Sequence, residues 1–256
     1  MATKWFIGCS GYYNYRWKGE FYPPSLPSSK WFEFYARFFN TLELNSTFYK
    51  FPRLKTLQNW HNNAPDGFVF SAKVPQFVTH FNRFQTDSRR MMDDFYGLLA
   101  NGLKDKCGCV LFQLPPSIHY SDDMLDRIIA NTNQEFTNAV EFRHASWWSK
   151  KVYDKLAKHD LIFSGHSYPK LPDNVVINSS TNYYRFHGIT RRYYSQYEES
   201  VVADVGTQLM KSKKVKTAFV YFNNTAAVSA LNNAMYLKQF VGEFKKNALV
   251  DSVAGK

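Results

Sequence analysis

Eight short apolar segments alternate with amphipathic stretches along this chain, and the alternation limits the folds that it can adopt. The segments begin near residues 5, 41, 68, 109, 138, 161, 182 and 217. Most intervals between them carry a helical pattern, although the interval after the sixth does not. Apolar strands separated by helices are typical of a parallel sheet covered by helices. We therefore predict a single TIM-like (β/α)8 barrel domain over residues 1–256, with a frayed tail from about residue 244.

A doubly wound open sheet is the main alternative for such an alternation. Nucleotide-binding sheets of that kind carry Gly-x-Gly-x-x-Gly directly after the first strand. This chain has Gly8-Cys9-Ser10-Gly11 at that place. Because the glycine spacing does not match, the sequence favours the barrel.

The charge balance favours an anionic partner. The chain carries 32 Lys and Arg against 21 Asp and Glu, which gives a formal net charge of +11. An excess of this size fits an anionic small molecule or a nucleic acid. A solvated basic surface is the competing explanation, and it fits Lys211, Lys213, Lys214 and Lys216, which follow one predicted helix. The informative cations are those at strand ends.

The sequence gives no sign of a membrane partner or of export. No apolar run approaches the ~20 residues that cross a bilayer. The chain starts Met-Ala-Thr-Lys-Trp, without a basic and then apolar leader. Cys9, Cys107 and Cys109 show no zinc-binding spacing, and we expect them to be small apolar filler. A cytoplasmic protein is expected.

Polar residues gather where the predicted strands end. In a barrel, catalytic groups lie at the C-terminal ends of the strands, so we predict a functional site there. Structural ion pairs are the alternative, since they also gather at strand ends. The ends supply Ser10, Glu43, Asn45, Lys73, Gln113, Glu141, Arg143, His144, His166, Arg185, His187 and Asn223, and His80 follows in a loop.

The residue types indicate acid/base chemistry in a cationic surrounding. Two carboxylates are outnumbered by three cations, which suits a phosphate or carboxylate ligand. The candidate catalytic residues are Glu43, Glu141, Lys73 and His187. The candidate substrate-binding residues are Ser10, Tyr12, Trp17, Asn45, His80, Gln113, Arg143, His144, Arg185, Asn223 and Asn224.

The two glutamates are expected to differ in role. Arg143 shares a strand face with Glu141, so it should lower the pKa of that carboxyl group and leave Glu141 to orient cations or substrate. Glu43 has no cation beside it in the sequence and lies between Leu42 and Leu44. Glu43 is therefore predicted to be the better general acid or base, unless Lys73 reaches it.

The remaining residues bear on two further kinds of site, one for phosphate and one for a metal. Asn223-Asn224-Thr225 precedes a predicted helix after the eighth strand, where barrels often hold phosphate, although simple helix capping explains it equally well. The histidines and glutamates could ligate a divalent metal, but three neighbouring cations oppose it. We predict no cofactor and regard a metal as the less favoured alternative.

Ordered motifs along the chain resemble those of a known family. They are Gly8-Cys9-Ser10-Gly11-Tyr12, Glu43-Leu44-Asn45-Ser46-Thr47-Phe48-Tyr49, Leu111-Phe112-Gln113-Leu114-Pro115-Pro116, Val140-Glu141-Phe142-Arg143-His144, Arg185-Phe186-His187-Gly188 and Tyr221-Phe222-Asn223-Asn224, among others. Over about residues 5–240 the chain resembles the DUF72 family of YecE-like proteins. The resemblance implies a TIM-like barrel and no known activity; a nuclease role follows only by analogy with the endonuclease IV barrel. Many relatives are expected to be acidic after strand six, where this chain has Gly165-His166.

Three functions remain open from the sequence. The first is an enzyme, such as a phosphodiesterase or nuclease-like hydrolase, that acts on a phosphorylated or nucleic-acid substrate by glutamate acid/base chemistry. The second is a non-catalytic nucleic-acid-binding protein that stacks bases on the aromatic loop from Tyr12 to Tyr22. The third is a two-carboxylate sugar-processing enzyme, which the excess of cations disfavours.

Overall fold

The computed structural model of the chain describes residues 2–85, 87–189 and 193–254, with side chains described up to residue 243. Its strands are β1 (Lys4–Cys9), β2 (Thr41–Leu44), β3 (Val69–Lys73), β4 (Cys107–Gln113), β5 (Asn138–Glu141), β6 (Leu161–Phe163), β7 (Gly165–Ser167), β8 (Thr181–Phe186) and β9 (Thr217–Phe222). Its α-helices are α1 (Trp31–Tyr35), α2 (Ser46–Tyr49), α3 (Leu54–Asn63), α4 (Ser88–Gly102), α5 (Asp122–Ala130), α6 (Lys150–Lys158), α7 (Glu199–Lys211) and α8 (Ser229–Ala254).

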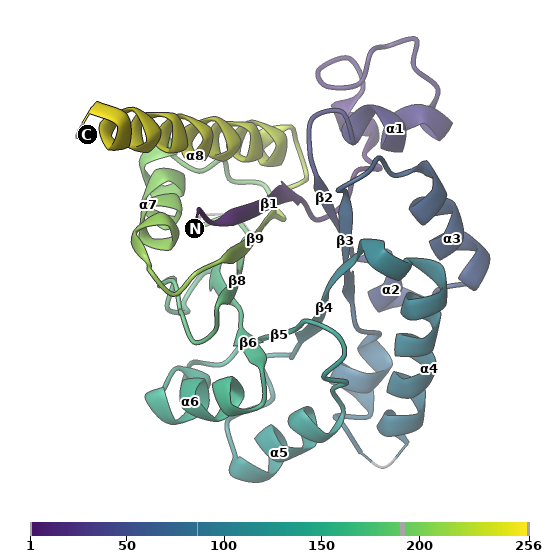
Figure 1. Cartoon of the computed structure of the whole chain (residues 1–256). Helices are drawn as coiled ribbons and strands as arrows, with labels where there is room; N and C mark the ends of the chain where they lie inside the picture. The colour runs from purple at the N-terminus through teal and green to yellow at the C-terminus, as the bar shows by residue number, and fades with distance from the viewer. Residues whose placement is uncertain (1, 86, 190–192, 255–256) are drawn as a thin grey trace.

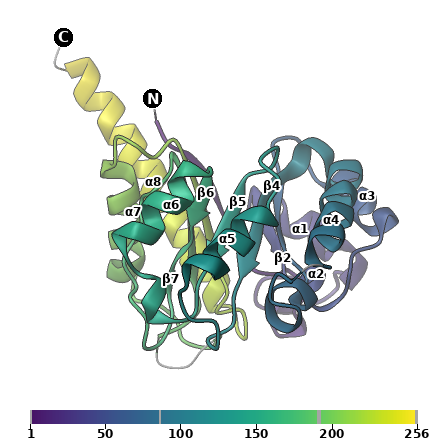
Figure 2. The same cartoon turned by 90° about the horizontal axis from the view of Figure 1, so that it is seen from below.

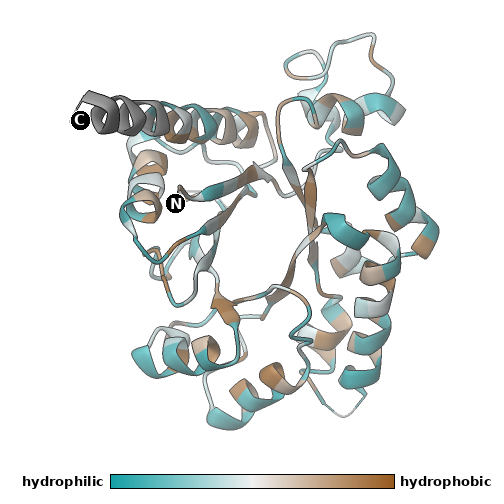
Figure 3. Cartoon of the chain, viewed as in Figure 1, coloured by the Kyte–Doolittle hydropathy of each residue, from teal (hydrophilic) through white to brown (hydrophobic). Residues whose placement is uncertain are grey.

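The strands form two parallel sheets, which confirms the predicted α/β class. One sheet has the order β1-β9-β8-β7 and the other the order β2-β3-β4-β5-β6. Figure 1 shows the strands around a common interior, with the helices outside them. The hydropathy colouring follows this arrangement, because apolar residues are prominent on the strands, whereas the outer helices mix apolar and polar residues (Figure 3). Such burial of both sheet faces is what parallel sheets require.

The sixth predicted strand continues further than expected and joins the two sheets. It divides at Ser164 into β6, which pairs with β5, and β7, which pairs with β8. The main-chain N–H of Ser164 still donates to the Val140 carbonyl at 2.9 Å. Gly165 permits the close approach, because a Cβ atom there would lie 2.9 Å from the Tyr184 ring. The expected strand exit at Gly165-His166 is therefore wrong, since both residues belong to β7.

In the described part of the chain, no main-chain strand pairing joins β1 to β2. Side-chain hydrogen bonds connect the two strands instead. The Asn40 amide donates to the Trp5 carbonyl at 2.8 Å and accepts from the Ile7 N–H at 3.2 Å. The Tyr35 hydroxyl accepts from the Cys9 N–H at 2.8 Å and donates to the Thr41 carbonyl at 3.0 Å. These four bonds give β1 and β2 polar partners along their shared border.

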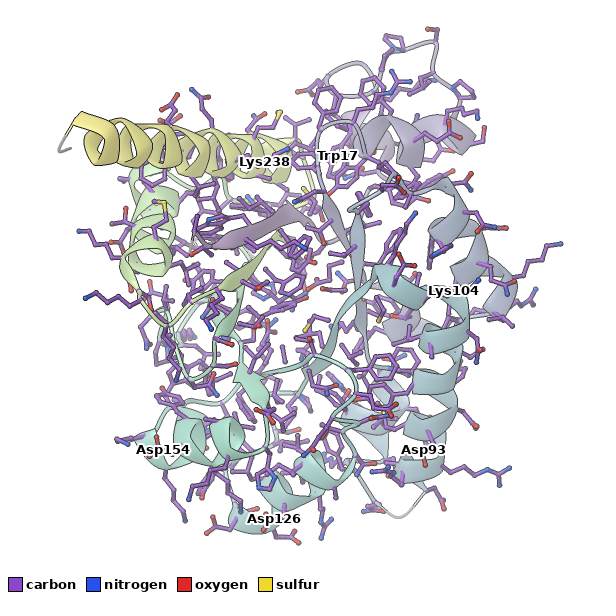
Figure 4. All side chains as sticks on the ribbon, viewed as in Figure 1. Trp17, Asp93, Lys104, Asp126, Asp154 and Lys238 are labelled. Atoms are coloured by element: carbon purple, nitrogen blue, oxygen red, sulfur yellow. The ribbon has the colours of Figure 1, made fainter. Side chains whose placement is uncertain are left out.

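Alternate strand residues from both sheets fill the interior. Side chains occupy the space that the ribbons leave between the strands (Figure 4). The hydroxyl of Tyr221, on β9, lies 2.6 Å from Thr41 Oγ1 and 2.8 Å from Ser71 Oγ, on β2 and β3. The apolar interior residues are Phe6, Cys109, Leu111, Ala139, Ile162, Tyr183, Phe219 and Tyr221. The interior is thus a packed core at its centre, with polar groups reaching it from one end.

The last helix differs from its prediction at both ends. We expected a helix from Ala226 through Phe240 and then a frayed tail, whereas α8 begins at Ser229 and continues to Ala254. Figure 2 shows the C-terminal end of α8 projecting beyond the other elements. No helix among the described residues is long and apolar enough to cross a membrane.

Candidate functional site

The site is built by strand alternation. Because every paired strand is parallel, the C-terminal ends of neighbouring strands lie at the same edge of each sheet. Inward positions at that edge carry polar residues in place of the apolar ones found deeper in the interior. These residues are Glu43 on β2, Lys73 on β3, Gln113 on β4, Glu141 on β5 and Arg185 on β8. The fold therefore brings these five of the selected residues to one end of the two sheets.

Arg185 occupies the centre of the site and bridges the two glutamates. Its Nη2 lies 2.6 Å from Glu43 Oε1, and its Nη1 lies 2.9 Å from Glu141 Oε2. The Tyr183 hydroxyl donates to the other Glu43 oxygen at 2.5 Å. All three charged side chains are at most 1% exposed. Such a group is stable only while every charge keeps its partner.

This arrangement corrects two sequence-based expectations. Glu43 has no cation beside it in the sequence, but Arg185 from β8 pairs with it in the structure. Both Glu43 oxygens already accept hydrogen bonds, so the carboxyl group is fixed in place and is poorly placed for proton transfer. Arg185 was expected to bind substrate, but it is 1% exposed and its guanidinium is committed to the two glutamates.

Glu141 also holds Arg143 and His187. Arg143 Nη2 forms an ion pair with Glu141 Oε1, and its guanidinium lies 3.9 Å from the centre of the Tyr168 ring. Burial alone would raise the pKa of Glu141, but Arg143, Arg185 and His187 hold that pKa well below its ordinary value. The direction agrees with the sequence-based expectation. Glu141 is thus ionised and serves three neighbours.

His187 is a neutral imidazole in this network. Its Nδ1 lies 3.0 Å from the Asn223 side-chain nitrogen, which donates to it, and its Nε2 lies 3.1 Å from Glu141 Oε2. A proton on Nε2 satisfies these two partners, whereas a bond from the Arg143 guanidinium needs an unprotonated Nε2, so no single neutral tautomer satisfies all three contacts. Arg143 Nη2 is also 3.0 Å from Nε2. Burial and Arg143 hold the pKa of His187 well below its ordinary value, so the ring stays uncharged at neutral pH.

Lys73 differs from the other cations of the site. Its Nζ donates to Gln113 Oε1 at 2.7 Å and lies 3.8 Å from the centre of the Phe48 ring. No carboxylate of the described residues lies within ion-pair distance of it. Burial, followed by repulsion from Arg185, lowers the pKa of Lys73 from 10.5 to about 7, although Glu141 and Glu43 oppose the change. Lys73 can therefore gain or lose a proton near neutral pH.

His80 lies beside Lys73 and does not compensate for its charge. Burial, Lys73 and Arg143 lower the pKa of His80 to about 4. Its Nδ1 is 2.8 Å from Thr79 Oγ1, and its ring packs edge-on against Phe48. His80 is therefore a neutral wall of the site at physiological pH.

Ser10 and Asn45 form a second polar corner at the ends of β1 and β2. The Asn45 amide donates to the Ser10 carbonyl at 3.3 Å. Ser10 Oγ and Asn45 Oδ1 are buried and meet no hydrogen-bond partner among the described residues. These two atoms remain available to a bound polar group.

Four predicted substrate-binding residues have other tasks. His144 stacks on His119, with ring centroids 3.7 Å apart, and its Nδ1 contacts Ser146. Trp17 is fully buried, and its indole N–H donates to the Ala227 carbonyl at 2.9 Å. The structure thus contradicts a ligand-binding role for Trp17, because it has no surface to offer.

Asn224 and Tyr12 also support the fold. The Asn224 amide donates to the Ser195 carbonyl at 2.9 Å and to Asn233 Oδ1 at 3.2 Å. Because α8 begins at Ser229, Asn224 is not at a helix N-terminus, and the predicted phosphate subsite is wrong in this respect. Tyr12 is half-buried and packs edge-on against Phe32.

The sequence analysis omitted three residues that contact the site. Tyr183 and Tyr168 have the contacts with Glu43 and Arg143 described above. His166, named at a strand end but left out of the candidate set, is fully buried, with its ring centroid 6.0 Å from that of His187. Tyr183 could have been found from the sequence, because it alternates with Arg185 on one strand.

Among described residues, no group of three or more His, Cys, Asp or Glu is arranged to hold a metal ion.

Comparison with known proteins gives consistent relatives. A family model described as "Protein of unknown function DUF72" matches residues 6–254. The UPF0759 protein YunF of Bacillus subtilis (strain 168) is 25% identical over 268 residues, covering 92% of this chain and 94% of YunF. The UPF0759 protein YecE of Escherichia coli (strain K12) is 29% identical over 121 residues, covering 46% of this chain and 43% of YecE.

Solved structures extend the likeness to three dimensions. A DUF72 family protein of Thermotoga maritima MSB8 has a TM-score of 0.84 at 25% identity, covering 93% of this chain and 99% of that one. A DUF72 family protein of Enterococcus faecalis V583 has a TM-score of 0.81 at 17% identity, covering 93% and 95%. The second likeness concerns the fold alone. The names of these relatives state no activity.

Proposed function

The chain belongs to the DUF72 family of proteins of unknown function, and from this premise we propose that it is an enzyme that performs acid/base chemistry on an anionic substrate. The reaction takes place at the C-terminal ends of the strands, where Lys73, Glu141, Arg143 and His187 meet. The single observation that carries the proposal is the environment of Lys73. A buried amine that titrates near neutral pH is suited to transfer protons under physiological conditions.

The proposed scaffold is one (β/α)8-type barrel that forms a single domain. Three observations support closure of the two sheets into one ring. Asn40 and Tyr35 bond β1 to β2, the chain runs directly from β6 into β7 through Ser164, and Arg185 contacts glutamates of the opposite sheet. Short irregular seams between strands are compatible with a barrel whose interior is filled by side chains.

The roles of the charged residues follow from their contacts. Glu43 and Arg185 form the rigid base of the site, because both are fully buried and paired with each other. Glu141 fixes Arg143 and His187. Lys73 transfers the proton. It therefore takes the acid/base role that the sequence analysis gave to Glu43.

The proposed substrate carries a phosphate or a carboxylate. Lys73 in its charged form and the Arg143 guanidinium supply the positive charge, and each residue is 8% exposed against 1% for Arg185. The overall charge of +11 adds a long-range attraction for anions. A phosphorylated small molecule or a nucleic acid fits this surrounding, and a phosphodiesterase is one reaction of this class.

The two-carboxylate sugar mechanism receives less support. It needs two carboxyl groups that face the substrate from opposite sides. Glu43 and Glu141 instead share the Arg185 guanidinium and are both 0% exposed. Neither carboxylate is free to act on a glycosidic bond in this arrangement.

The test is turnover with a matched lysine pair. Wild type, Lys73→Met and Lys150→Met would be assayed on phosphomonoesters, phosphodiesters and single-stranded oligonucleotides. Lys150 is an exposed helical lysine that pairs with Asp154, so its variant controls for loss of one charge. We expect Lys73→Met to lower kcat by about 10²-fold or more and Lys150→Met to leave it unchanged. Equal turnover by both variants would remove Lys73 from the mechanism.

A non-catalytic nucleic-acid-binding protein is the second candidate, and exposed aromatic residues favour it. Tyr15, Tyr49 and Phe81 follow β1, β2 and β3 and are 65%, 73% and 68% exposed. Exposed rings beside cations are suited to stacking with single-stranded bases. Salt-dependent oligonucleotide binding that falls in Tyr49→Ala, without turnover of any substrate, would favour this candidate over the enzyme.

A further inference from the structure

Lys73 has the surroundings of a nucleophilic amine. Among the described residues its Nζ has one hydrogen bond, to the neutral Gln113 amide oxygen, and it rests on the face of Phe48. The charged groups that act on it are Arg185, Glu141, Glu43 and Arg143, and the neutral His80 ring lies nearby. The two glutamates already pair with the two arginines, and no carboxylate in the described part of the chain forms an ion pair with Lys73.

Such surroundings favour the uncharged amine. One N–H of Lys73 donates to Gln113. The lone pair of the uncharged nitrogen accepts no hydrogen bond from an acidic group of the described residues. The lowering of the pKa of Lys73 to about 7 is consistent with this arrangement. At neutral pH an ordinary lysine is neutral in roughly one molecule in a few thousand, whereas a group titrating near 7 is neutral in about half. Desolvation of this kind activates lysines toward carbonyl carbons.

We propose that Lys73 is a covalent nucleophile that forms an imine with an anionic aldehyde or ketone bound at the C-terminal ends of the strands. This inference rests on the proposed function, because it names the substrate class and the reacting atom for the same site. The positive charge of Arg143 holds the anionic group of the substrate, and the carbonyl carbon lies next to Lys73 Nζ. Lys73 is then a catalytic residue that makes a bond with the substrate as well as moving a proton.

The step balances without an added reactant. The Nζ lone pair bonds to the carbonyl carbon, and the carbonyl π electrons move to oxygen, which takes up a proton to give a carbinolamine. The hydroxyl group then takes up a second proton and leaves as water, while nitrogen forms a double bond to carbon. Starting from the ammonium form and the carbonyl compound, the products are one protonated imine and one water. The ionised Glu141 lies within electrostatic reach and stabilises the resulting positive charge.

The experiment traps the imine by reduction. The full chain is incubated with glyoxylate, a small anionic aldehyde, and sodium cyanoborohydride at neutral pH, and peptides are mapped by mass spectrometry. We expect carboxymethylation of Lys73 to be at least about ten-fold faster than that of other lysines. Because the uncharged amine reacts, the rate at Lys73 should rise with pH and level off above about 7, while exposed lysines continue to gain reactivity. Labelling of Lys73 at the rate of exposed lysines would overturn the proposal, and this comparison needs no variant.

Two variants sharpen the result. Lys73→Arg keeps a cation and removes the nucleophile, so the fast adduct should disappear, while Lys150→Arg should retain it. A fast adduct that persists elsewhere in Lys73→Arg would overturn the assignment.

Inorganic phosphate separates this inference from the proposed function. Phosphate that binds wild type and slows the labelling of Lys73 supports both. Phosphate that binds wild type and binds Lys73→Met more weakly, without any fast adduct from glyoxylate, overturns imine formation and leaves the anion site intact. Failure of both measurements overturns both.

Discussion

The Arg185 guanidinium of β8 lies 2.6 Å from the Glu43 carboxylate of β2, although these strands belong to different sheets. The two residues are separated by 142 positions in the sequence and both are buried. The pair therefore fixes the relative position of the sheets as well as the base of the candidate site.

Replacing Arg185 by Met should destabilise the protein strongly. The change leaves Glu43 and Glu141 buried without their shared cation, and loss of one member of a buried pair costs roughly 3–5 kcal/mol. Urea denaturation measures the effect. Arg127→Met, which breaks a partly exposed pair with Asp123, is the control and should change the free energy of unfolding little. A small effect in both variants would show that Arg185 is dispensable for the fold.

Replacing Lys73 by Met should stabilise the protein at pH 7, by about 1–3 kcal/mol. The penalty for burying an ammonium disappears, partly offset by loss of the Gln113 hydrogen bond and the Phe48 contact. The folded-state pKa of Lys73, about 7, is below its ordinary 10.5, so the unfolded chain binds more protons between these values. Wild-type stability should therefore gain a contribution as pH rises from about 7 to 10.5 that Lys73→Met lacks. Parallel pH curves for the two proteins would contradict this.

Acidification should act through the buried histidines. Burial is the main cause that lowers the pKa of His166 and of His80 from 6.5 to about 4. The unfolded chain therefore takes up protons between pH 6.5 and 4 that the folded chain refuses, and stability falls as pH falls through this window. His166→Phe keeps an aromatic ring beside Trp148 and should flatten the dependence. His159→Gln, at the end of α6, is the control and should retain the wild-type slope.

Two tyrosine hydroxyls provide a matched comparison. Tyr183 donates to Glu43, which pairs with Arg185, whereas Tyr221 bonds the hydroxyls of Thr41 and Ser71. Bonds to charged groups contribute about 1.5–3 kcal/mol and neutral ones about 0.5–1.5 kcal/mol. Tyr221→Phe removes two neutral bonds and Tyr183→Phe removes one charged bond, so Tyr183→Phe should cost more free energy of unfolding per hydrogen bond lost. The reverse order in thermal or urea denaturation would show that Glu43 does not depend on the hydroxyl of Tyr183.

Strand periodicity allowed much of the site to be predicted. Glu43, Lys73, Glu141 and Arg185 each lie on the inward side of a strand near its end, and alternation fixes that direction from local sequence alone. The strand starts were predicted for the same reason, since short apolar runs of strand length mark buried parallel strands.

Partnership across the interior could not be predicted. Which cation pairs with Glu43 depends on how β2 and β8 come to face each other in the fold. The residues next to Glu43 in the sequence do not determine that arrangement. The same limit explains Trp17 and Asn224, whose polar groups bond to loops far away in the sequence. Their residue types suit ligand binding and loop anchoring equally well.

The Asn40 side chain makes hydrogen bonds to β1 that a main-chain peptide group makes between paired strands. Its amide group donates to Trp5 and accepts from Ile7 as a neighbouring peptide group would. Main-chain pairing between strands is indifferent to most substitutions, because every residue except proline supplies the same N–H and C=O groups. At this border the hydrogen bonds come from two side chains, Asn40 and Tyr35, so a substitution at either position removes bonds that main-chain groups supply elsewhere in the sheets.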